Sequence, residues 1–473
     1  MPIQSIASKA IHTLGSKESL IPVMIKDGID SASLTWHSYK AGGKIEGKDR
    51  AIDEFGTQAV WIGGIPFYKK LIDNTAYKYA GINPGVDIRV IRDKEYADWA
   101  LKNAKGLMPE STFQALKNKF KTFLKLKTAE TQSVYDAISG CLKDGGKSAV
   151  NLYKYKVFVS TALTLLTFFL LTKEKQNETK KSVKEEFHKK IHNKAGVFTG
   201  NTQKKNNNIF AGIENFSSQP SKAPAFKGRL KSVYEAVLFN PVHNMKVIDA
   251  GITAERLGCS RNKTELCEHA IKEGSFLFFL YKFGSILENA VNKLSANLFK
   301  KPVDLEIDVL MDETFAKALE NNKAASDAAL YPVSGTLSDK LNFIAANPQN
   351  TLIAAAKKSK IISETKDKTG RMCIDTSKYI DTESMDELAG KLKNIQTSFL
   401  NSGESIKTYM NKSKALKITA VMTNMIISCI FFAYVIPKTV YKFRKAKTGT
   451  LDFHAANDII KEEQNKAGKN NAA

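Results

Sequence analysis

The sequence predicts a mainly α-helical membrane protein with two transmembrane helices, mixed but mostly helical extramembrane regions and a few short strands. Two uncharged runs of membrane-spanning length predict the transmembrane helices, at residues 155–173 and 416–437. Apolar residues at helical spacing predict most of the remaining structure, and short alternating runs predict the strands. With 473 residues, the chain is long enough for two or three domains.

The two apolar runs differ in length but not in character. Val157–Thr172 is uncharged throughout, and Tyr155 with the snorkelling side chain of Lys156 extends it to the thickness of a bilayer. Ile418–Pro437 is a longer uncharged run between two lysines. Each run contains nine or ten Leu, Ile, Val or Phe residues, which favour membrane insertion by about 4 kcal/mol before polar costs. We therefore expect a multi-pass membrane protein whose first partner is the lipid bilayer.

Two further segments are candidates for the membrane. Ser275–Leu287 has eight strongly apolar residues, but Lys282 near its centre costs roughly 3 kcal/mol. A buried or interfacial helix is therefore the first interpretation of residues 275–288, and a true span is the alternative. Phe55–Tyr68 is also uncharged, but two glycines and a proline are expected to break any long helix there. Its length suits a core, re-entrant or interfacial segment.

The balance of basic residues does not determine the orientation of the two spans. Their fifteen-residue flanks place nine lysines and arginines on each side of a two-span hairpin. Residues 1–20 show no basic segment followed by a continuous apolar core, so no export signal for the N-terminal region is visible. We therefore expect both the N- and the C-terminus in the cytoplasm.

The composition shifts along the chain divide it into seven predicted segments. In chain order they are an N-terminal extramembrane region at 1–150, the first transmembrane helix at 155–173, a charged juxtamembrane helix at 174–194, a polar linker at 195–228, a mostly helical inter-span region at 229–415, the second transmembrane helix at 416–437 and a basic, then polar, tail at 438–473. The linker is rich in Asn, Ser, Gln and Pro, with too little regular apolar spacing to pack.

Four local patterns predict individual elements outside the spans. Val86–Arg92 and Val303–Val309 alternate as short strands do. Ser111–Lys127 opens with a capping box and carries one apolar stripe, which predicts an amphipathic helix. Thr382–Leu400 has apolar residues at the 3-4-3-4 spacing of a helix-packing seam. The seam is too short for an extended coiled coil, so we expect a helix pair or a bundle element.

Basic side chains near the spans predict contact with anionic lipids. They are Lys117, Lys119, Lys121 and Lys125 on the helix at 111–127, and Lys438, Lys442, Arg444 and Lys445 after the second span. The alternative for the helix at 111–127 is that its phenylalanine face packs on a domain core. Nucleic acid is not an expected partner, because the net charge of +23 arises from lysines spread along the chain with only eight arginines.

Polar residues inside the spans predict contacts between helices. Ser160, Thr164 and Thr167 share one face of the first span, and Asn424 and Ser428 share one face of the second. An asparagine in hydrocarbon needs a hydrogen-bonding partner, so we hypothesise that the two spans pack through these faces. The alternative is that the hydroxyl groups bond to carbonyls of their own helix.

No pattern predicts a catalytic, cofactor-binding or metal site. Gly42–Asp49 and Cys141–Ser148 come close to a phosphate-binding loop, but the first has an aspartate where a hydroxyl should hold magnesium, and the second lacks its first glycine. Neither follows a predicted strand, so both are interpreted as glycine- and lysine-rich turns. Glu185 with His188 and His192, the Cys259, Cys267 and His269 set, and the acids at 304–308 lack the spacing or the second ligand set of a metal site.

The leading hypothesis for function is a membrane-anchored scaffold or binding protein, with a protein partner or a second copy contacting residues 382–400. The alternative is a component of an oligomeric small-solute transporter or pore in which 55–68 and 275–288 join the two spans. Lys282 would then be an intramembrane charge, which is a residue class that commonly serves transport. A nucleotide-dependent enzyme is a third class, and it depends on the two incomplete loops.

Overall fold

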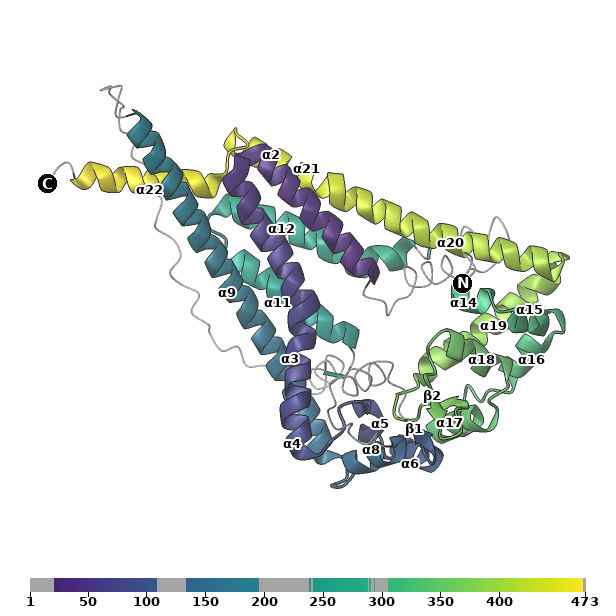
Figure 1. The fold of residues 1–473 in the computed structure, drawn as a ribbon. Coiled ribbons are helices and arrows are strands. Elements are labelled where there is room, and N and C mark those ends of the chain that lie inside the picture. The colour runs from purple at the N-terminus through teal and green to yellow at the C-terminus, as the bar shows by residue number, and fades with distance from the viewer. Residues whose placement is uncertain are drawn as a thin grey trace, which may run out of the picture. The chain divides into compact units, whose positions relative to one another are not determined.

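The computed structural model describes residues 21–108, 133–194, 238–239, 241–287, 289–290, 293 and 305–470. It is 80% helical and has few strands (Figure 1). Two helices, spanning Lys147–Lys189 and Ile406–Thr448, are long and apolar enough to cross a membrane. The predicted helical class and both long apolar helices are thus confirmed. The amphipathic helix at 111–127 and the linker at 195–228 lie outside the described residues.

The elements follow one another with short connections. In chain order they are α2 (Ile21–Ala59), η1 (Val60–Gly64), α3 (Ile65–Ile72), η2 (Asp73–Tyr77), α4 (Lys78–Ala80), α5 (Ile88–Arg92), α6 (Lys94–Asn103), β1 (Leu107–Met108), α8 (Val134–Cys141), α9 (Lys147–Lys194), α11 (Pro241–Gly258), α12 (Lys263–Phe278), η3 (Phe279–Phe283), α14 (Ile307–Leu310), α15 (Glu313–Glu320), α16 (Lys323–Ala329), α17 (Leu337–Ala346), α18 (Thr351–Lys358), β2 (Glu364–Asp367), β3 (Met372–Ile374), α19 (Thr382–Ser402), α20 (Ile406–Ile430), η4 (Phe431–Val435), α21 (Ile436–Thr448) and α22 (His454–Asn470). The η elements are π-helical turns.

The chain divides into two compact units, each assembled from segments that are distant in sequence. Unit 1 comprises Met1–Ser33, Gln58–Thr164 and Ile271–Lys438, and unit 2 comprises Leu34–Thr57, Leu165–Ala270 and Thr439–Ala473. Both units therefore combine residues from several of the linear segments that composition suggests.

Unit 1 contains a helical domain that is discontinuous in sequence. We call residues 82–108, 134–150 and 305–402 the split domain. Helices α14–α19 gather around a three-stranded antiparallel sheet of order β1-β2-β3, with α6 beside α17 (Figure 1). Its core side chains include Leu319, Leu341, Ile344 and Leu352, all fully buried.

Tyr96 ties the early part of the split domain to its late part. Its hydroxyl donates to the carbonyl of Lys378 at 3.3 Å and accepts from the backbone N–H of Ile380 at 2.7 Å. Its ring stacks on Tyr379 with centroids 5.1 Å apart. The backbone N–H of Asp87 donates to the carbonyl of Ser377 at 2.8 Å, and strand β1 pairs with β2. The two parts therefore form one folded body.

The predicted seam at 382–400 is confirmed as helix α19. Met385, Leu388, Leu392 and Ile395 are buried, and α19 packs against α16 and α18. The helix begins where Asp381 accepts a hydrogen bond from the N–H of Glu383, as an N-cap residue does. The seam thus supplies part of the split-domain core, which leaves the opposite face of α19 at the surface.

Both predicted strands at 86–92 and 303–309 were wrong. Residues 88–92 form α5, because the side chain of Asp87 caps a helix by accepting the N–H of Arg89 at 3.0 Å. Residues 307–310 form α14, whose buried residues Ile307 and Leu310 lie three apart, as on one helix face. The alternating pattern was too short to distinguish a strand from a single helical turn. The observed strands instead flank a turn at Gly370 and include residues 107–108.

Helix α2 bends back on itself at Gly43, which has φ 76° and ψ −164°. Residues other than glycine rarely adopt such a conformation. The side-chain amide of Gln58 donates to the carbonyl of Met24 at 3.4 Å, although these residues would lie about 51 Å apart in a straight helix. Helix α2 is therefore two arms, a first arm at 21–42 and a second arm at 44–59, that run side by side.

The expectation that Gly63, Gly64 and Pro66 break the helix near residues 55–68 was wrong. The second arm of α2 continues through η1 into α3. Proline cannot donate a backbone hydrogen bond, and its ring collides with the carbonyl four residues earlier in an α-helix. The wider π-helical turn η1 ends two residues before Pro66 and accommodates this change. The π-helical turn η4 has the same position relative to Pro437.

The carbonyl four residues before Pro437 receives a hydrogen bond from another helix. Pro437 has no N–H for the α-helical bond to the carbonyl of Ala433. The hydroxyl of Ser33, on the first arm of α2, donates to that carbonyl at 2.6 Å. Nearer the start of the same arm, the amine of Lys26 lies 3.5 Å from Oδ1 of Asn424. These two contacts hold the first arm of α2 beside the second apolar run.

We expect Ser33→Ala to lower the free energy of unfolding by about 1–3 kcal/mol, because it leaves the carbonyl of Ala433 without this partner. In a Pro437→Ala background the new N–H can bond to the same carbonyl, so the loss caused by Ser33→Ala should shrink. Unfolding of the full chain in detergent micelles measures both. Ser326→Ala, which removes a hydroxyl bonded only within its own helix, is the control. Equal losses in the two backgrounds would contradict this explanation.

Candidate functional site

Few residues of the two long apolar helices are buried. In the most apolar window of each helix, only 22% and 17% of the residues are buried. On α20 and η4, exposed residues recur at every fourth position, at Met422, Ile426, Ile430 and Tyr434. The core helix of a soluble protein would bury such a stripe. The two helices therefore present apolar faces that no described part of the chain covers.

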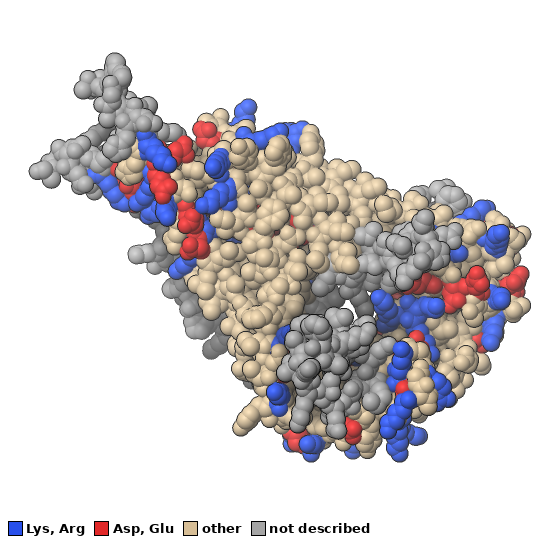
Figure 2. Space-filling view, in the orientation of Figure 1, with Lys and Arg blue, Asp and Glu red and all other residues tan. Residues whose placement is uncertain are grey.

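Charged side chains on α9 begin directly after its apolar run. In unit 2, Leu166 and Leu170 are exposed, and Figure 2 shows this stretch as uncharged surface. Lysines and acids gather over the C-terminal part of α9 and over α22 (Figure 2). There, Lys184 pairs with Glu463 at 3.0 Å. The boundary between the two kinds of surface lies near Thr172.

A set of buried charges lies on one face of the second arm of α2. We call these residues the charged stripe: Glu46, Asp49, Arg50, Asp53 and Glu54. They recur at intervals of three and four residues, so they share one helix face, and they are between 1% and 8% exposed. Buried charges are costly unless they are paired. Three other helices of unit 2, together with the loop before α12, supply the pairs.

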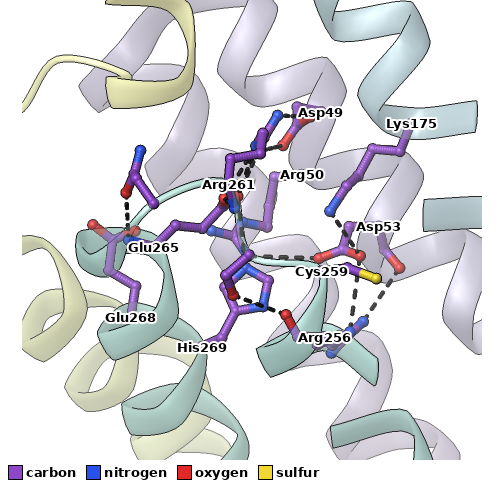
Figure 3. Close-up of polar contacts among 12 residues, drawn as sticks. Asp49, Arg50, Asp53, Lys175, Arg256, Cys259, Arg261, Glu265, Glu268 and His269 are labelled. Atoms are coloured by element: carbon purple, nitrogen blue, oxygen red, sulfur yellow. Dashed lines mark hydrogen bonds and ion pairs between the residues drawn. The ribbon is translucent and has the colours of Figure 1, made fainter. Parts of the chain in front are cut away.

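Asp53 is the centre of the first group of pairs. Lys175 on α9 lies 3.3 Å from its carboxylate, and Arg256 on α11 lies 3.8 Å from it (Figure 3). Arg256 also donates to the hydroxyl of Thr57 at 2.8 Å. Burial alone would raise the pKa of Asp53, but Arg256 and Lys175 together hold it well below its ordinary value. Asp53 is therefore ionised and joins three helices.

Asp49 and Arg261 form the second group. The guanidinium of Arg261 donates to both carboxylate oxygens of Asp49 at 3.0 Å and to Oε1 of Glu265 at 2.5 Å (Figure 3). Thr179 on α9 donates to the same aspartate at 2.5 Å. Burial opposes the ionisation of Glu265, but Arg261 lowers its pKa to about 2. Bidentate pairs of this kind fix orientation as well as charge.

His269 borders the second group. Its Nε2 lies 3.8 Å from Glu265, and burial lowers the pKa of His269 to about 4, with the positive charge of Arg50 acting in the same direction. The histidine is therefore neutral at pH 7 and contributes no charge to the network.

Arg444 holds the third group together. Its Nε and one terminal nitrogen donate to the two carboxylate oxygens of Glu268 at 2.7 Å, and the other terminal nitrogen donates to Glu46 at 2.8 Å. The hydroxyl of Tyr441 donates to Glu46 at 3.3 Å and shares a 2.5 Å hydrogen bond with Ser38. Burial raises the pKa of Glu46, although Arg444 and Arg50 oppose this. A methyl group at Gly42 would collide with this carboxylate, so glycine is required there.

The network combines six carboxylates with five cations. They are Glu46, Asp49, Asp53, Glu54, Glu265 and Glu268 on one side, and Arg50, Lys175, Arg256, Arg261 and Arg444 on the other. No three His, Cys, Asp or Glu side chains among the described residues are placed to hold a metal ion. What this arrangement does is to join α2, α9, α11, α12 and α21 through charge. Sequence analysis missed it, although the spacing of the charged stripe was visible.

The polar residues predicted inside the spans find several kinds of partner. Ser160 and Thr164 donate to carbonyls of their own helix, at 3.2 and 2.7 Å. Asn424 accepts from Ser428 at 3.3 Å and from Lys26 at 3.5 Å. Asn424 is therefore bonded to the first arm of α2 and within α20. Thr167 also has an interaction partner. Packing of the two spans against each other stays a prediction.

In unit 2, two glycines allow close approach to the apolar run of α9. A methyl group at Gly56 on α2 would lie 2.8 Å from Leu171, and one at Gly251 on α11 would lie 2.7 Å from Leu165. A larger residue at either position would force the leucine side chain to shift. Small residues commonly permit such contacts between helices in membranes. Nothing in the local sequence distinguishes these glycines from those in turns.

The basic residues predicted at the membrane surface separate into two classes. Lys438, Lys442 and Lys445 are exposed, and the amine of Lys438 donates to the hydroxyl of Tyr434. Arg444, expected beside them at the surface, is instead buried in the third group of pairs. Residues 111–127, with Lys117, Lys119, Lys121 and Lys125, lie outside the described structure.

The two incomplete phosphate-binding loops lie at helix boundaries. Gly43 forms the bend of α2, and the carboxylate of Asp49 accepts hydrogen bonds from Arg261. Gly146, with φ 83°, precedes α9, where a methyl group would lie 2.7 Å from Ile91. Neither segment follows a strand. The second segment contains the turn between α8 and α9, whereas the first departs from helical geometry only at Gly43 and is helical over the rest of its length.

We expect Arg444→Met to destabilise the full chain by about 3–5 kcal/mol, because it leaves Glu46 and Glu268 buried without their cation. Arg371→Met removes an arginine whose side chain is exposed and pairs only with Asp367, so it should cost less than about 1 kcal/mol. Chemical unfolding in detergent micelles measures both. Equal effects of the two substitutions would show that the third group does not hold the helices.

We expect the stability of the chain to fall by about 2 kcal/mol between about pH 7 and about pH 5 because of His269. Its folded pKa of about 4 lies below its ordinary value of 6.5, so the unfolded chain binds more protons in this window and is favoured as the pH falls. Unfolding measured at both pH values should show this loss in the wild type and in His188→Gln, an exposed control, but not in His269→Gln. A loss of the same size in His269→Gln would exclude His269 as its source.

Comparison with known proteins gave no relative for this chain. No protein-family model, no curated protein and no solved structure matches it. Its function is therefore inferred from its own residues and their geometry.

Proposed function

We propose that this chain is an integral membrane protein, anchored through α9 and α20, that serves as a membrane-anchored scaffold or binding protein. The observation that carries the proposal is the direct attachment of the split domain to both long apolar helices. Helix α8 ends at Cys141 and α9 begins at Lys147, while α19 ends at Ser402 and α20 begins at Ile406. A folded body thus stands at the start of each helix.

The exposed apolar faces support the membrane part of this proposal. Exposed residues of the second run lie in line at intervals of four, from Met422 to Tyr434. Lipid acyl chains are a partner that covers such a face without specific polar contacts. Lys438 beside Tyr434 matches the aromatic and basic residues that favour a membrane interface.

The split domain supports the scaffold part. Its helices pack into a closed core, and within the described residues it holds no cluster arranged for metal binding. The apolar seam of α19 is used inside this core. A partner at 382–400 would therefore contact the opposite face, which carries Lys393, Thr397 and the exposed Leu400. These residues lie three and four apart, so they share one helix face.

A second candidate function is a component of an oligomeric small-solute transporter or pore. The contact between Lys26 and Asn424 favours it, because the amine of Lys26 is buried against the middle of the second apolar run. Ionisable groups at such positions commonly mark solute or proton pathways. The same lysine also stabilises Asn424 in a purely structural way, which is why the scaffold comes first.

We expect the full-length chain to stay in vesicles after a carbonate wash, and a photo-crosslinking residue at Thr397 to yield a defined adduct with a second copy or another protein. The adduct is expected because Thr397 lies on the exposed face of α19, where a partner can contact it. The same residue placed at Lys368, in the exposed turn after β2, is the matched control and should yield none.

Three outcomes distinguish the candidates. Release of the chain by carbonate would contradict the proposed membrane anchoring. Recovery of only uncrosslinked monomer with the residue at either position would contradict the scaffold function. Planar-bilayer currents in potassium chloride that Lys26→Met abolishes would favour the pore.

A further inference from the structure

The split domain contains chain from both sides of the first span. Residues 82–108 and 134–150 precede the apolar run of α9, and residues 305–402 follow it. Strand β1 pairs with β2, matching Leu107 to Asp367, and Tyr96 holds the backbone of Ile380. Residues that share a sheet and a core must lie in the same aqueous compartment.

This shared domain restricts how often the chain crosses the bilayer. If α9 carries the chain away from the split domain, the chain must return before residue 305. We propose that it crosses the bilayer a second time through Ser275–Leu287, so that α9 and α20 run in the same direction and residues 439–470 face the compartment opposite the split domain. The inference rests on the proposed membrane anchoring of α9 and α20. It replaces the two-span hairpin with three crossings between residues 147 and 448.

Ser275–Leu287 suits the return crossing better than the rest of the described chain between α9 and residue 305. Helix α11 carries Lys246, Asp249, Glu255 and Arg256, whereas Ser275–Leu287 carries only Lys282. Ser275–Leu287 alone covers only about 20 Å, but the helix continues before it through Lys272 and Glu273. These two residues are buried and pair with each other at 3.2 Å, so the crossing can extend beyond this segment. Lys282 is exposed, so its long side chain can reach toward a membrane interface.

The aromatic face of this segment packs on the second apolar run within unit 1. Phe279 lies 4.3 Å from Phe431 between ring centroids, and Phe276 lies 5.6 Å from Phe432. Gly284 lies beside Asn424, whose amide would be 3.5 Å from a methyl group there. The segment is therefore a direct neighbour of a helix proposed to lie in the bilayer.

The opposite face of the segment fits lipid acyl chains. Phe278 and Ile286 are 45% and 53% exposed. They are eight residues apart, or about 12 Å along a helix axis. This apolar face is continuous with a helix already assigned to the membrane, and acyl chains are the occupant that such a position supplies.

The start of α20 agrees with these three crossings. Its first turns pack on the split domain, since the hydroxyl of Tyr409 donates to the carbonyl of Ile395 at 3.3 Å. The helix therefore begins on the domain side, as α9 does.

Unit 2 gives separate support for the shared direction of α9 and α20. Lys175, three residues after the end of the first run, pairs with Asp53, and Arg444, seven residues after the end of the second, pairs with Glu46. Both acids belong to the charged stripe. The C-terminal ends of the two helices thus meet in one network.

Single cysteines in the full chain test the proposal. The five native cysteines are replaced by serine, and a membrane-impermeant maleimide is applied to sealed vesicles before and after permeabilisation. The test positions are Lys102→Cys and Lys393→Cys in the two parts of the split domain, Lys181→Cys and Asn465→Cys in unit 2, and Phe278→Cys and Ile286→Cys in the proposed return crossing. The four aqueous positions are exposed in the structure.

We expect Lys102→Cys and Lys393→Cys to react on one side, Lys181→Cys and Asn465→Cys on the other, and Phe278→Cys and Ile286→Cys to resist labelling until detergent is added. Reaction of Lys393→Cys on the side of Lys181→Cys, or labelling of Phe278→Cys as fast as Lys393→Cys, overturns the return crossing while leaving the membrane anchor intact. Reaction of all positions without permeabilisation, together with release by carbonate, overturns the anchor itself. An epitope tag after Ala473 and another at Gly370, with the native cysteines retained, must give the same sidedness and check the serine background.

Discussion

The charged stripe on the second arm of α2 is the interaction on which the helical assembly of unit 2 depends. Each of its acids would be costly to bury alone, and cations from α9, α11, α12 with its preceding loop, and α21 approach them within 4 Å. Charge pairing is directional, unlike apolar contact, so it fixes which helix lies next to which. The glycines at positions 42 and 43 are linked to the same stripe. Gly42 leaves room for the side chain of Glu46, and Gly43 turns the chain directly before the charged stripe.

The long helices illustrate what a sequence can predict. The apolar runs of α9 and α20, and the seam of α19, were visible because periodic or uninterrupted apolar residues report directly on solvation. The charged stripe had an equally clear period, but charges at helical spacing occur on solvated faces as often as on buried ones. Its partners, Lys175, Arg256 and Arg444, lie more than a hundred residues away. Only the fold brings them together.

The predictions of short elements were wrong for a different reason. Residues 86–92 and 307–310 are so brief that alternation and a single helical turn look alike, and a capping aspartate at 87 decided one of the two cases. Pro66 was expected to break its helix, yet a π-helical turn placed just before it lets the helix continue, and a second such turn precedes Pro437. Ser33 then supplies a hydrogen bond to Ala433, a pairing that depends on tertiary structure.

The discontinuity of the split domain sets an order of events during synthesis. Strand β1 is complete at residue 108 but meets its partner only when residues 364–367 have been made. At usual elongation rates of 5–20 residues per second, this interval lasts roughly 10–50 s. During that time the early helices α5, α6 and α8 lack the surface that later buries Tyr96 and Trp99. Nascent chains of this protein are therefore expected to depend on chaperones until the ribosome has passed β2.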